Sequence, residues 1–238
     1  MLTAIINDLH IPFQDNILVR KWLGFVQSSR PNTIVINGDL IDMWELSSFD
    51  KVPKSGESVQ KELNMAKEFL RSLRRVHTGR IIYTEGNHSF RFKKFLITVA
   101  PELYGLDGLS LEELLELEDM GIEFIQSPSD AAGWQDCYTV IDNIYVGHFN
   151  LIRQHAGYTA KALIDKYGVS IIQGHVHRYG VYTKRLIDGT ELVGVENFCM
   201  CDMNPGYMRN PNWSQGFSII KDGNIIPIPY NNGRFIHL

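Results

Sequence analysis

Side chains of the types that bind metal ions follow short apolar runs at five places in this chain. Each run has the length of a β-strand, and a glycine adjoins the polar side chains in four of the five segments. Because the carboxyl ends of neighbouring strands in an α/β sheet meet in one crevice, we expect these side chains to converge. The pattern therefore favours an α/β chain built around one polar site. The five segments are Asn7-Asp8-Leu9-His10, Asn37-Gly38-Asp39-Leu40-Ile41-Asp42, Glu85-Gly86-Asn87-His88, Val146-Gly147-His148 and Gly174-His175-Val176-His177.

The spacing within these segments suits metal binding. Asp8 and His10 are two residues apart, as are His175 and His177, so both members of each pair point the same way in extended chain. Carboxylate oxygens combined with imidazole nitrogens suit Mn, Fe, Zn or Ni better than a thiolate-preferring metal. Asp39 has two carboxylate oxygens and could bridge two cations. A single histidine in a strand is more often structural, but five clusters together favour a metal site.

The hydrophobic pattern alternates strands and helices over the first two thirds of the chain. Apolar runs predict strands at 2–7, 33–37, 80–84, 144–146 and 169–173. Apolar residues at helical spacing predict helices at 15–28, 58–77 and 158–167, and Ser110-Leu111-Glu112-Glu113 fits a capping box. From Val181 onward, short β-like runs are broken by Gly, Asn and Pro. This order predicts helices covering one sheet, and a second, more antiparallel sheet.

Length and composition exclude several classes of protein. The 238 residues fit one large domain or two small ones, and no linker divides them, so we expect a single domain over 1–238. The apolar runs are too short for a transmembrane helix, and the first residues lack the basic leader of a secretory signal peptide. Three cysteines, an odd number, suggest reduced thiols in a cytoplasm. The net charge of -4 argues against a protein that holds duplex nucleic acid mainly by its phosphates.

The motifs as a set resemble the calcineurin-like metallophosphoesterase superfamily. They occur in the family's order between residues 8 and 177, and segments 155–160 and 211–217 are similar to compact members from bacteria and phages. The resemblance implies an α/β (α+β) fold, a four-layer αββα sandwich of two mixed β-sheets flanked by helices. The motifs that carry it are Asp8-x-His10, Gly38-Asp39-x-x-Asp42, Gly86-Asn87-His88, Gly147-His148 and Gly174-His175-x-His177.

The resemblance also implies a dinuclear metal centre. Two divalent ions are expected, with Mn²⁺ as the first choice and Fe, Zn or Ni as alternatives. Asp39 would bridge the two ions. The implied ligands are Asp8, His10, Asp39 and His177 for the first ion, and Asp39, Asn87, His148 and His175 for the second.

The implied activity is hydrolysis of phosphate mono- or diesters through a hydroxide activated by the two metal ions. His88 would donate a proton to the departing oxygen. Asp42 would orient His88 and keep its imidazolium available near neutral pH. We therefore expect a phosphatase or phosphodiesterase whose partner is a small phosphoester or nucleotide-like substrate.

Two other functions stay open at this point. A DNA or RNA nuclease of the same superfamily is one alternative, although the acidic balance and the lack of an added DNA-binding domain do not favour it. A non-catalytic interaction scaffold is less favoured, because every expected ligand and His88 are retained. Membrane binding is not expected, the oligomeric state is left open, and the expected location is a bacterial or phage-infected host cytoplasm.

The sequence departs from the family pattern after Asp42. Many family phosphatases carry an arginine there that contacts phosphate, whereas this chain has Met43-Trp44. Arg91 and Arg153 follow two of the histidine motifs and are the candidate replacements. A planar guanidinium matches two phosphate oxygens, but the alternative for each is an ordinary surface arginine.

Some remaining residues carry weaker signals. The segment Cys199-Met200-Cys201 invites a metal-binding interpretation, but no second cysteine pair lies nearby and a structural zinc site needs four ligands. Aromatic residues near the motifs could stack on a base, although packing in the core or at a cavity rim is the more ordinary role. These aromatic residues are Trp44, Phe49, Phe90 and Tyr179.

Overall fold

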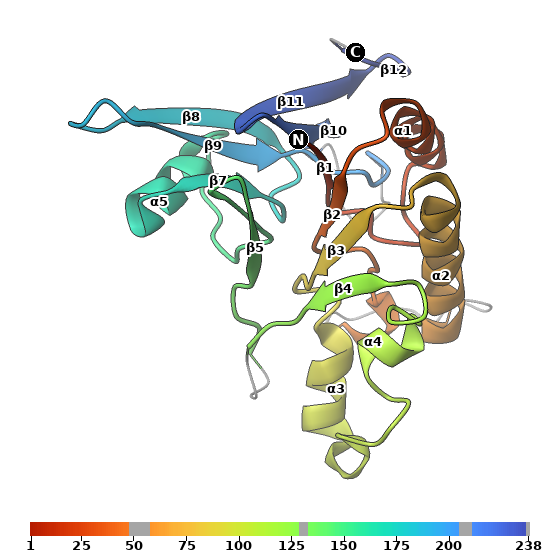
Figure 1. The fold of residues 1–238 in the computed structure, drawn as a ribbon. Coiled ribbons are helices and arrows are strands. Elements are labelled where there is room, and N and C mark those ends of the chain that lie inside the picture. Colours follow the sequence, from red (N-terminus) through yellow and green to blue (C-terminus); the bar gives the residue numbers. More distant parts are fainter. Residues whose placement is uncertain (48–57, 129–132, 205–210, 237–238) are drawn as a thin grey trace.

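Two β-sheets stack face to face, and helices cover the outer face of each sheet (Figure 1). The computed structural model describes residues 1–47, 58–128, 133–204 and 211–236. Seven strands form one sheet and five form the other. Phe49, one of the aromatic residues considered above, lies outside the described residues.

The seven-stranded sheet has the order β12-β11-β10-β1-β2-β3-β4. Strands β1 to β4 are parallel neighbours, so their carboxyl ends share one edge of the sheet. On the other side of β1, strands β10, β11 and β12 pair antiparallel. The strands are β1 (Leu2–Ile6), β2 (Thr33–Asn37), β3 (Arg80–Thr84), β4 (Ile122–Ile125), β10 (Gln215–Lys221), β11 (Asn224–Asn231) and β12 (Arg234–Phe235).

The five-stranded sheet has the order β5-β6-β7-β9-β8. Its three central strands are parallel, and an antiparallel strand lies at each edge. Both sheets are therefore mixed, as the resemblance implied. The strands are β5 (Tyr138–Ile141), β6 (Ile144–Gly147), β7 (Ser170–Gln173), β8 (Tyr179–Arg185) and β9 (Glu191–Asn197).

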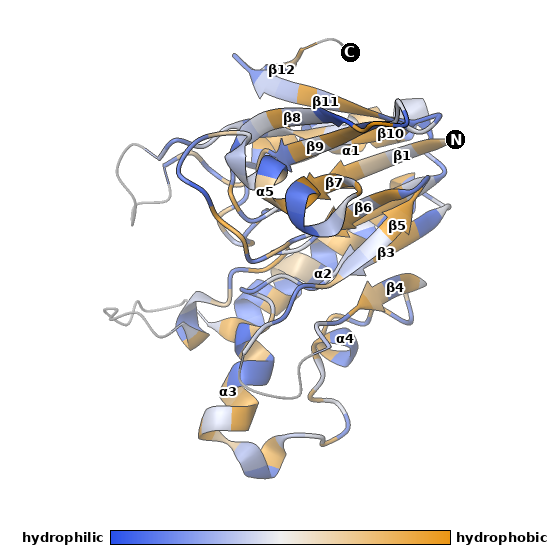
Figure 2. Cartoon of the chain, turned by 90° about the vertical axis from the view of Figure 1, so that its left-hand side faces the viewer, coloured by the Kyte–Doolittle hydropathy of each residue, from blue (hydrophilic) through white to orange (hydrophobic). Residues whose placement is uncertain are grey.

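Alternate residues of the central strands face opposite layers, because side chains of a strand point in turn to its two faces. In β1, Ala4 and Ile6 belong to the apolar cluster beneath the helices, whereas Ile5 belongs to the cluster between the sheets. In β7, Ile171 packs beneath the helix on the far side and Ile172 lies between the sheets. Three apolar interfaces thus separate four layers (Figure 2). The expected αββα sandwich is confirmed.

The helices lie mainly on the two outer faces. Helices α1 and α2 cover the seven-stranded sheet, and α5 packs on β7, β8 and β9 of the other sheet (Figure 1). The helices are α1 (Asn16–Ser29), α2 (Val59–Val76), α3 (Arg91–Val99), α4 (Leu111–Leu114) and α5 (Tyr158–Tyr167), with 3₁₀-helices η1 (Trp44–Leu46) and η2 (Pro101–Leu103).

The predicted helix starts coincide with capping side chains. The carboxylate of Asp15 accepts hydrogen bonds from two backbone N–H groups at the start of α1, and Ser58 caps α2 in the same way. Ser110 and Glu113 form the predicted capping box before α4. These caps satisfy N–H groups that the helix itself leaves without partners. The three predicted helices and five predicted strands are confirmed to within about two residues at each end.

The fold differs from the sequence prediction in its last third. The predicted antiparallel runs do not form a sheet of their own: β8 and β9 join the five-stranded sheet, and β10 to β12 join the seven-stranded sheet beside β1. Hydrophobic alternation identifies a strand but does not name its partner. Helix α3 and strands β4 and β5 were not predicted.

Within the four described ranges, no helix combines the length and the apolar character that crossing a bilayer requires. Helix α2 has 18 residues, but only one face is apolar and lies against the sheet. Apart from the buried Glu62, its charged residues lie mainly on the other faces, as expected for an amphipathic helix of a sandwich.

Candidate metal centre

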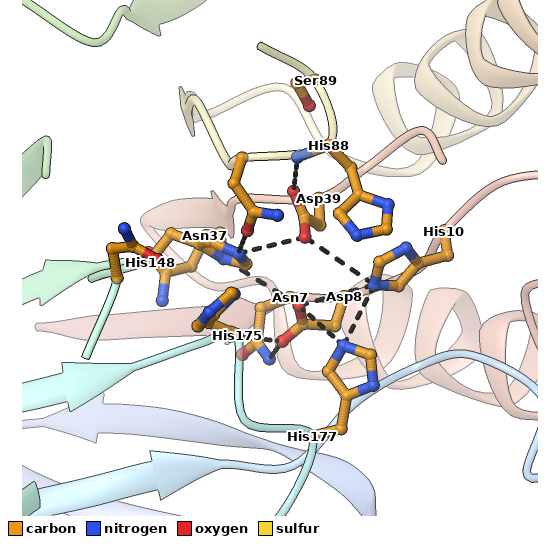
Figure 3. Close-up of polar contacts among 12 residues, drawn as sticks. Asn7, Asp8, His10, Asn37, Asp39, His88, Ser89, His148, His175 and His177 are labelled. Carbon is orange, nitrogen blue, oxygen red and sulfur yellow. Dashed lines mark hydrogen bonds and ion pairs between the residues drawn. The ribbon is translucent and has the colours of Figure 1, made fainter. Parts of the chain in front are cut away.

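The carboxyl ends of five strands meet where the two sheets adjoin (Figure 3). The seven-stranded sheet contributes Asp8 after β1, Asp39 after β2 and His88 after β3. The five-stranded sheet contributes His148 after β6 and His177 after β7. The five sequence motifs therefore converge on one site, although they span 170 residues of chain.

Five candidate ligands adopt a left-handed backbone conformation that is uncommon for residues other than glycine. Such a conformation costs of order 1–3 kcal/mol and persists only where the surrounding structure enforces it. Its concentration here indicates that the turns are shaped to aim side chains into the site. The residues are Asp8 (φ 53°), His10 (φ 48°), Asp39 (φ 40°), His175 (φ 75°) and His177 (φ 55°).

Two motif glycines are required by the close approach of ligand side chains. A Cβ atom on Gly38 would lie 2.2 Å from Nδ1 of His148. A Cβ atom on Gly86 would lie 2.1 Å from Oδ1 of Asp39. Both separations are far below van der Waals contact, so any larger residue would displace a ligand.

Asp8, His10 and His177 form the first ligand group, with one donor atom each within 4.8 Å of the others. Nε2 of His177 lies 3.0 Å from Nε2 of His10 and 3.2 Å from Oδ1 of Asp8. Among the described residues, no hydrogen-bond donor is assigned to that buried carboxylate oxygen, whereas the other accepts the backbone N–H of His175. An anionic oxygen and two imidazole nitrogens thus face one point.

Asp39, His148 and His175 form the second ligand group, again within 4.8 Å of one another. Nε2 of His148 lies 3.1 Å from Oδ2 of Asp39 and 3.0 Å from Oδ1 of Asn87. The side-chain oxygen of Asn87 therefore reaches this group, as the resemblance implied.

Asp39 lies between the two groups. Its Oδ2 is 3.1 Å from Nε2 of His148 in the second group and 3.8 Å from Nε2 of His10 in the first. Its Oδ1 accepts the backbone N–H of His88 at 2.9 Å, which fixes the carboxylate plane. This position suits a carboxylate shared by two cations.

The electrostatic environment keeps the carboxylates ionised. Burial by itself raises the pKa of Asp8 and of Asp39, but the charges of nearby histidines outweigh burial and lower both pKa values well below the usual range. Burial lowers the pKa of His177, yet Asp8 reverses the effect and raises it to about 9. Burial and the charge of His148 lower the pKa of His175 to about 3. Asp8 and Asp39 therefore stay anionic within the site, and a divalent cation can replace the histidine protons that balance them.

The donor set fits two divalent cations. Carboxylate, imidazole and amide oxygen donors match the preferences of first-row divalent metals. The orphaned oxygen of Asp8 supports this fit, because a buried anionic atom without a donor is costly unless a cation approaches it. These clusters of aspartate and histidine side chains could therefore hold metal ions.

His88 and Asp42 lie together beside the ligand groups, as expected. Oδ1 of Asp42 lies 2.9 Å from Nδ1 of His88 and 2.8 Å from Nδ1 of His10. The contact with His10 was not predicted, and it turns Nε2 of His10 toward the first group. Burial lowers the pKa of His88, and the carboxylates of Asp39 and Asp42 oppose this only in part. The hydrogen bond with Asp42 raises the pKa of His88, as expected, but burial outweighs it in the metal-free site.

The two candidate arginines occupy different places. Arg91 lies at the site: its Nη1 donates to the backbone oxygen of Asp42 at 2.7 Å, and Nη2 lies 3.1 Å from Nε2 of His88. Arg153 is exposed, and its Nη1 donates to the backbone oxygen of Ile152. The structure brings Arg91, but not Arg153, into contact with the predicted catalytic pair.

A cavity of about 760 Å³ opens onto the ligand groups. Arg91 lines it, and among the described lining residues Arg153 does not occur. Trp44 and Trp213 form an aromatic wall of the cavity, so the departure at Met43-Trp44 places an indole beside the site. Sequence reasoning missed the lining residues Ile152, Val176, Arg178, Asn212 and Trp213.

The other aromatic residues considered from the sequence have packing roles. Phe90 is buried, and the ring of Tyr179 stacks on Phe198 with centroids 4.6 Å apart. Trp213, in contrast, meets the ring of His177 edge to face at 4.4 Å. The sequence did not predict this contact, because Trp213 lies after residue 200, far from the motifs in the chain.

Some known proteins are similar to this chain in sequence or in fold. The Gene 54 protein of Mycobacterium phage D29 is 28% identical over 251 residues, covering 98% of this chain and 94% of the relative. The Gene 54 protein of Mycobacterium phage L5 is 26% identical with the same coverage. Vps29 of Entamoeba histolytica shares the fold, with a TM-score of 0.51 for a single mutant and 0.50 for the wild type complexed with Zn²⁺. Each Vps29 chain is 14% identical, covering 99% of this chain and 96% of that one.

The family model for calcineurin-like phosphoesterases matches residues 1–179. The matched region contains all five strand-end motifs, including the last one at His175 and His177. Since that region is most of the chain and holds every candidate ligand, the chain belongs to the calcineurin-like phosphoesterase family.

Proposed function

We propose that this protein is a dinuclear-metal phosphoesterase that hydrolyses phosphate mono- or diesters of small, nucleotide-like molecules. The position of Asp39 between two ligand groups is the observation that carries the proposal. A pair of divalent ions, when bound, supplies positive charge for the phosphate and activates water as the nucleophile. Mn²⁺ is the first choice for these ions, with Fe, Zn or Ni as alternatives.

His88 is proposed to hand a proton to the departing ester oxygen. It lines the cavity, and its Nδ1 faces Oδ1 of Asp42, which leaves Nε2 as the atom that can serve the substrate. In the structure Nε2 faces Arg91. We infer that the guanidinium of Arg91 turns to the phosphate when substrate binds, and so frees Nε2 for the leaving group.

The cavity walls support a small organic ester as substrate. Trp44 and Trp213 lie beside the polar floor, together with Ile152 and Val176. An apolar wall with a few convergent polar groups is typical of small-molecule sites, and an indole can stack on a base or another flat leaving group. We propose a nucleotide or similar aromatic phosphoester on this ground.

A substrate panel tests the proposal. Protein loaded with Mn²⁺ is assayed with nucleoside monophosphates, cyclic nucleotides, nitrophenyl mono- and diesters, and single-stranded DNA. Turnover of one or more small esters that disappears with a chelator is the expected result. Absence of turnover for every compound with every divalent metal tried would refute the proposed activity.

Variants test the role of His88. The change His88→Ala is expected to retain bound metal and to lose far more activity on esters with poor leaving groups than on nitrophenyl esters, because only the former need a proton. His155→Ala is the matched control, since His155 is exposed and its ring meets that of Tyr158 edge to face. Equal losses on both classes of ester would remove His88 from the acid role.

The same assay addresses the two alternatives. Turnover of DNA alone would favour a nuclease, for which Trp44 and Trp213 would serve as base-stacking platforms. Metal binding without any turnover would favour an interaction scaffold. We place the site of action in a bacterial or phage-infected cytoplasm, in keeping with the phage relatives.

A further inference from the structure

The segment Cys199-Met200-Cys201 lies directly behind the first ligand group. Cys199 and Cys201 are two residues apart and buried. Backbone hydrogen bonds fix the segment: the N–H of Cys199 donates to the oxygen of Ser214, and the N–H of Met200 donates to the oxygen of Asp8. Both thiols are therefore held at defined positions beside the metal centre.

His177 adds a third donor to the two thiols. One donor atom from each of Cys199, Cys201 and His177 lies within 4.8 Å of the others. Nε2 of His177 faces Asp8 and His10, whereas the buried Nδ1 is assigned no oxygen or nitrogen partner among the described residues, and the thiol of Cys201 interacts with the ring. The Nδ1 edge of the ring, which points away from the first ligand group, is thus available to the thiols.

The separations suit one ion. Donors that each lie about 2.3 Å from a zinc-sized ion are roughly 4 Å from one another. Donor atoms at the limit of 4.8 Å would have to approach one another by less than about 1 Å, and side-chain rotation can supply this movement. Sequence alone offered two cysteines and no further ligand nearby, because His177 is 22 residues away from Cys199.

We propose that Cys199, Cys201 and Nδ1 of His177 form a third metal site, which takes one thiophilic ion. Two sulfur donors select a soft ion, unlike the oxygen- and nitrogen-rich dinuclear centre. The two thiols bind as thiolates, and the ring of His177, bound at both nitrogens, binds as an imidazolate. The two thiol protons and the Nδ1 proton are released to solvent. The third site and the dinuclear centre share the ring of His177, so the thiophilic ion holds the orientation in which Nε2 faces Asp8.

Cadmium titration tests the third site. Reduced protein loaded with Mn²⁺ is titrated with Cd²⁺, and thiolate-to-cadmium charge transfer is followed in the ultraviolet. The band is expected to saturate at one Cd²⁺ per chain. Cys199→Ser and Cys201→Ser should each lose most of it. Cys137→Ser is the matched control and should keep it, because Cys137 is buried elsewhere, against the backbone oxygen of Glu85.

Absence of the band in the unsubstituted protein would overturn the proposal, as would its survival in the double variant of Cys199 and Cys201. X-ray absorption at the cadmium edge of the unsubstituted protein gives a readout that does not depend on variant folding. Two sulfur neighbours are expected, and one or none would contradict the site. These signals arise from the thiolates alone, so they are independent of the phosphoesterase assay.

Discussion

Nε2 of His10 lies 3.0 Å from Nε2 of His177, although the two residues follow strands of different sheets. Two imidazole nitrogens at this distance either share a proton or bind one cation between them. With Asp8 beside them, a divalent cation is the more favourable partner. A bound ion would therefore join the two sheets across the sandwich.

Metal loading is expected to stabilise the fold, because the ion binds the native site and not the unfolded chain. At a free concentration of about 100 times the dissociation constant, the gain is about 2.7 kcal/mol, or roughly 5–10 °C in Tm for a chain of this length. Thermal unfolding with Mn²⁺ and with a chelator measures it. His177→Ala should show a smaller difference in Tm between the two conditions. Equal Tm values for the parent protein with Mn²⁺ and with chelator would contradict the expected link between metal binding and stability.

Asp42→Asn is expected to weaken two functions together. The carboxylate contacts both His10 and His88, so its loss affects a metal ligand and the proposed proton donor. Outer contacts of this kind typically contribute 10–100-fold to affinity or activity, at order-of-magnitude level. Mn²⁺ affinity and kcat are measured for Asp42→Asn and for the control Asp107→Asn, which changes an exposed loop residue. Unchanged Mn²⁺ affinity would show that Asp42 supports His88 and does not support His10 as a metal ligand.

Arg91→Ala and Arg153→Ala decide between the two candidate phosphate ligands. Arg91 lines the cavity beside His88, so its removal is expected to raise KM and the inhibition constant of inorganic phosphate about 10–100-fold, the range for a hydrogen bond to a charged group. Arg153→Ala should stay within about twofold, because its guanidinium donates to the chain beside it. A larger effect of Arg153→Ala would reverse this assignment.

Glu62 gives the fold a measurable pH dependence. It is 5% exposed, its Oε2 accepts the N–H of Met43, and burial raises its pKa from 4.5 to about 7. The native state then holds the proton more tightly than the unfolded chain, so stability falls as pH rises from 4.5 to 7. The loss is at most about 3.5 kcal/mol for this shift, at about 1.4 kcal/mol per pH unit.

Glu62→Gln keeps an acceptor for Met43 but carries no charge. It is expected to leave the free energy of unfolding nearly unchanged at pH 4.5 and to raise it at pH 8. Denaturant unfolding at several pH values measures the difference, with Glu68→Gln, an exposed position on the same helix, as control. Parallel pH profiles for parent and Glu62→Gln would contradict the buried proton.

Local signals account for the elements that the sequence predicted. Asp15, Ser58 and Ser110 mark helix starts by capping, and their effect is confined to the next few residues. Helix α3 lacks such a signal, because its N-cap residue Phe90 makes no side-chain capping bond. Strands β4 and β5 have four residues each, too short for a clear alternation.

The candidate site likewise contains residues that the sequence predicted and contacts that it could not predict. Asp8, Asp39 and His148 could be predicted because each ends an apolar run, and strand ends converge. The second contact of Asp42, with His10, could not be predicted, since it joins residues 32 positions apart. The approach of His177 to Trp213 likewise depends on how the last strands pair, which hydrophobic alternation does not specify.

The metal content of the Asp39→Asn variant tests the shared carboxylate most directly. Native protein saturated with Mn²⁺ and then freed of excess metal is expected to hold two ions per chain by elemental analysis. Asp39→Asn should hold one or none, because the position between His10 and His148 needs negative charge for both ions. Two ions retained by Asp39→Asn, or none bound by the native chain, would contradict the account.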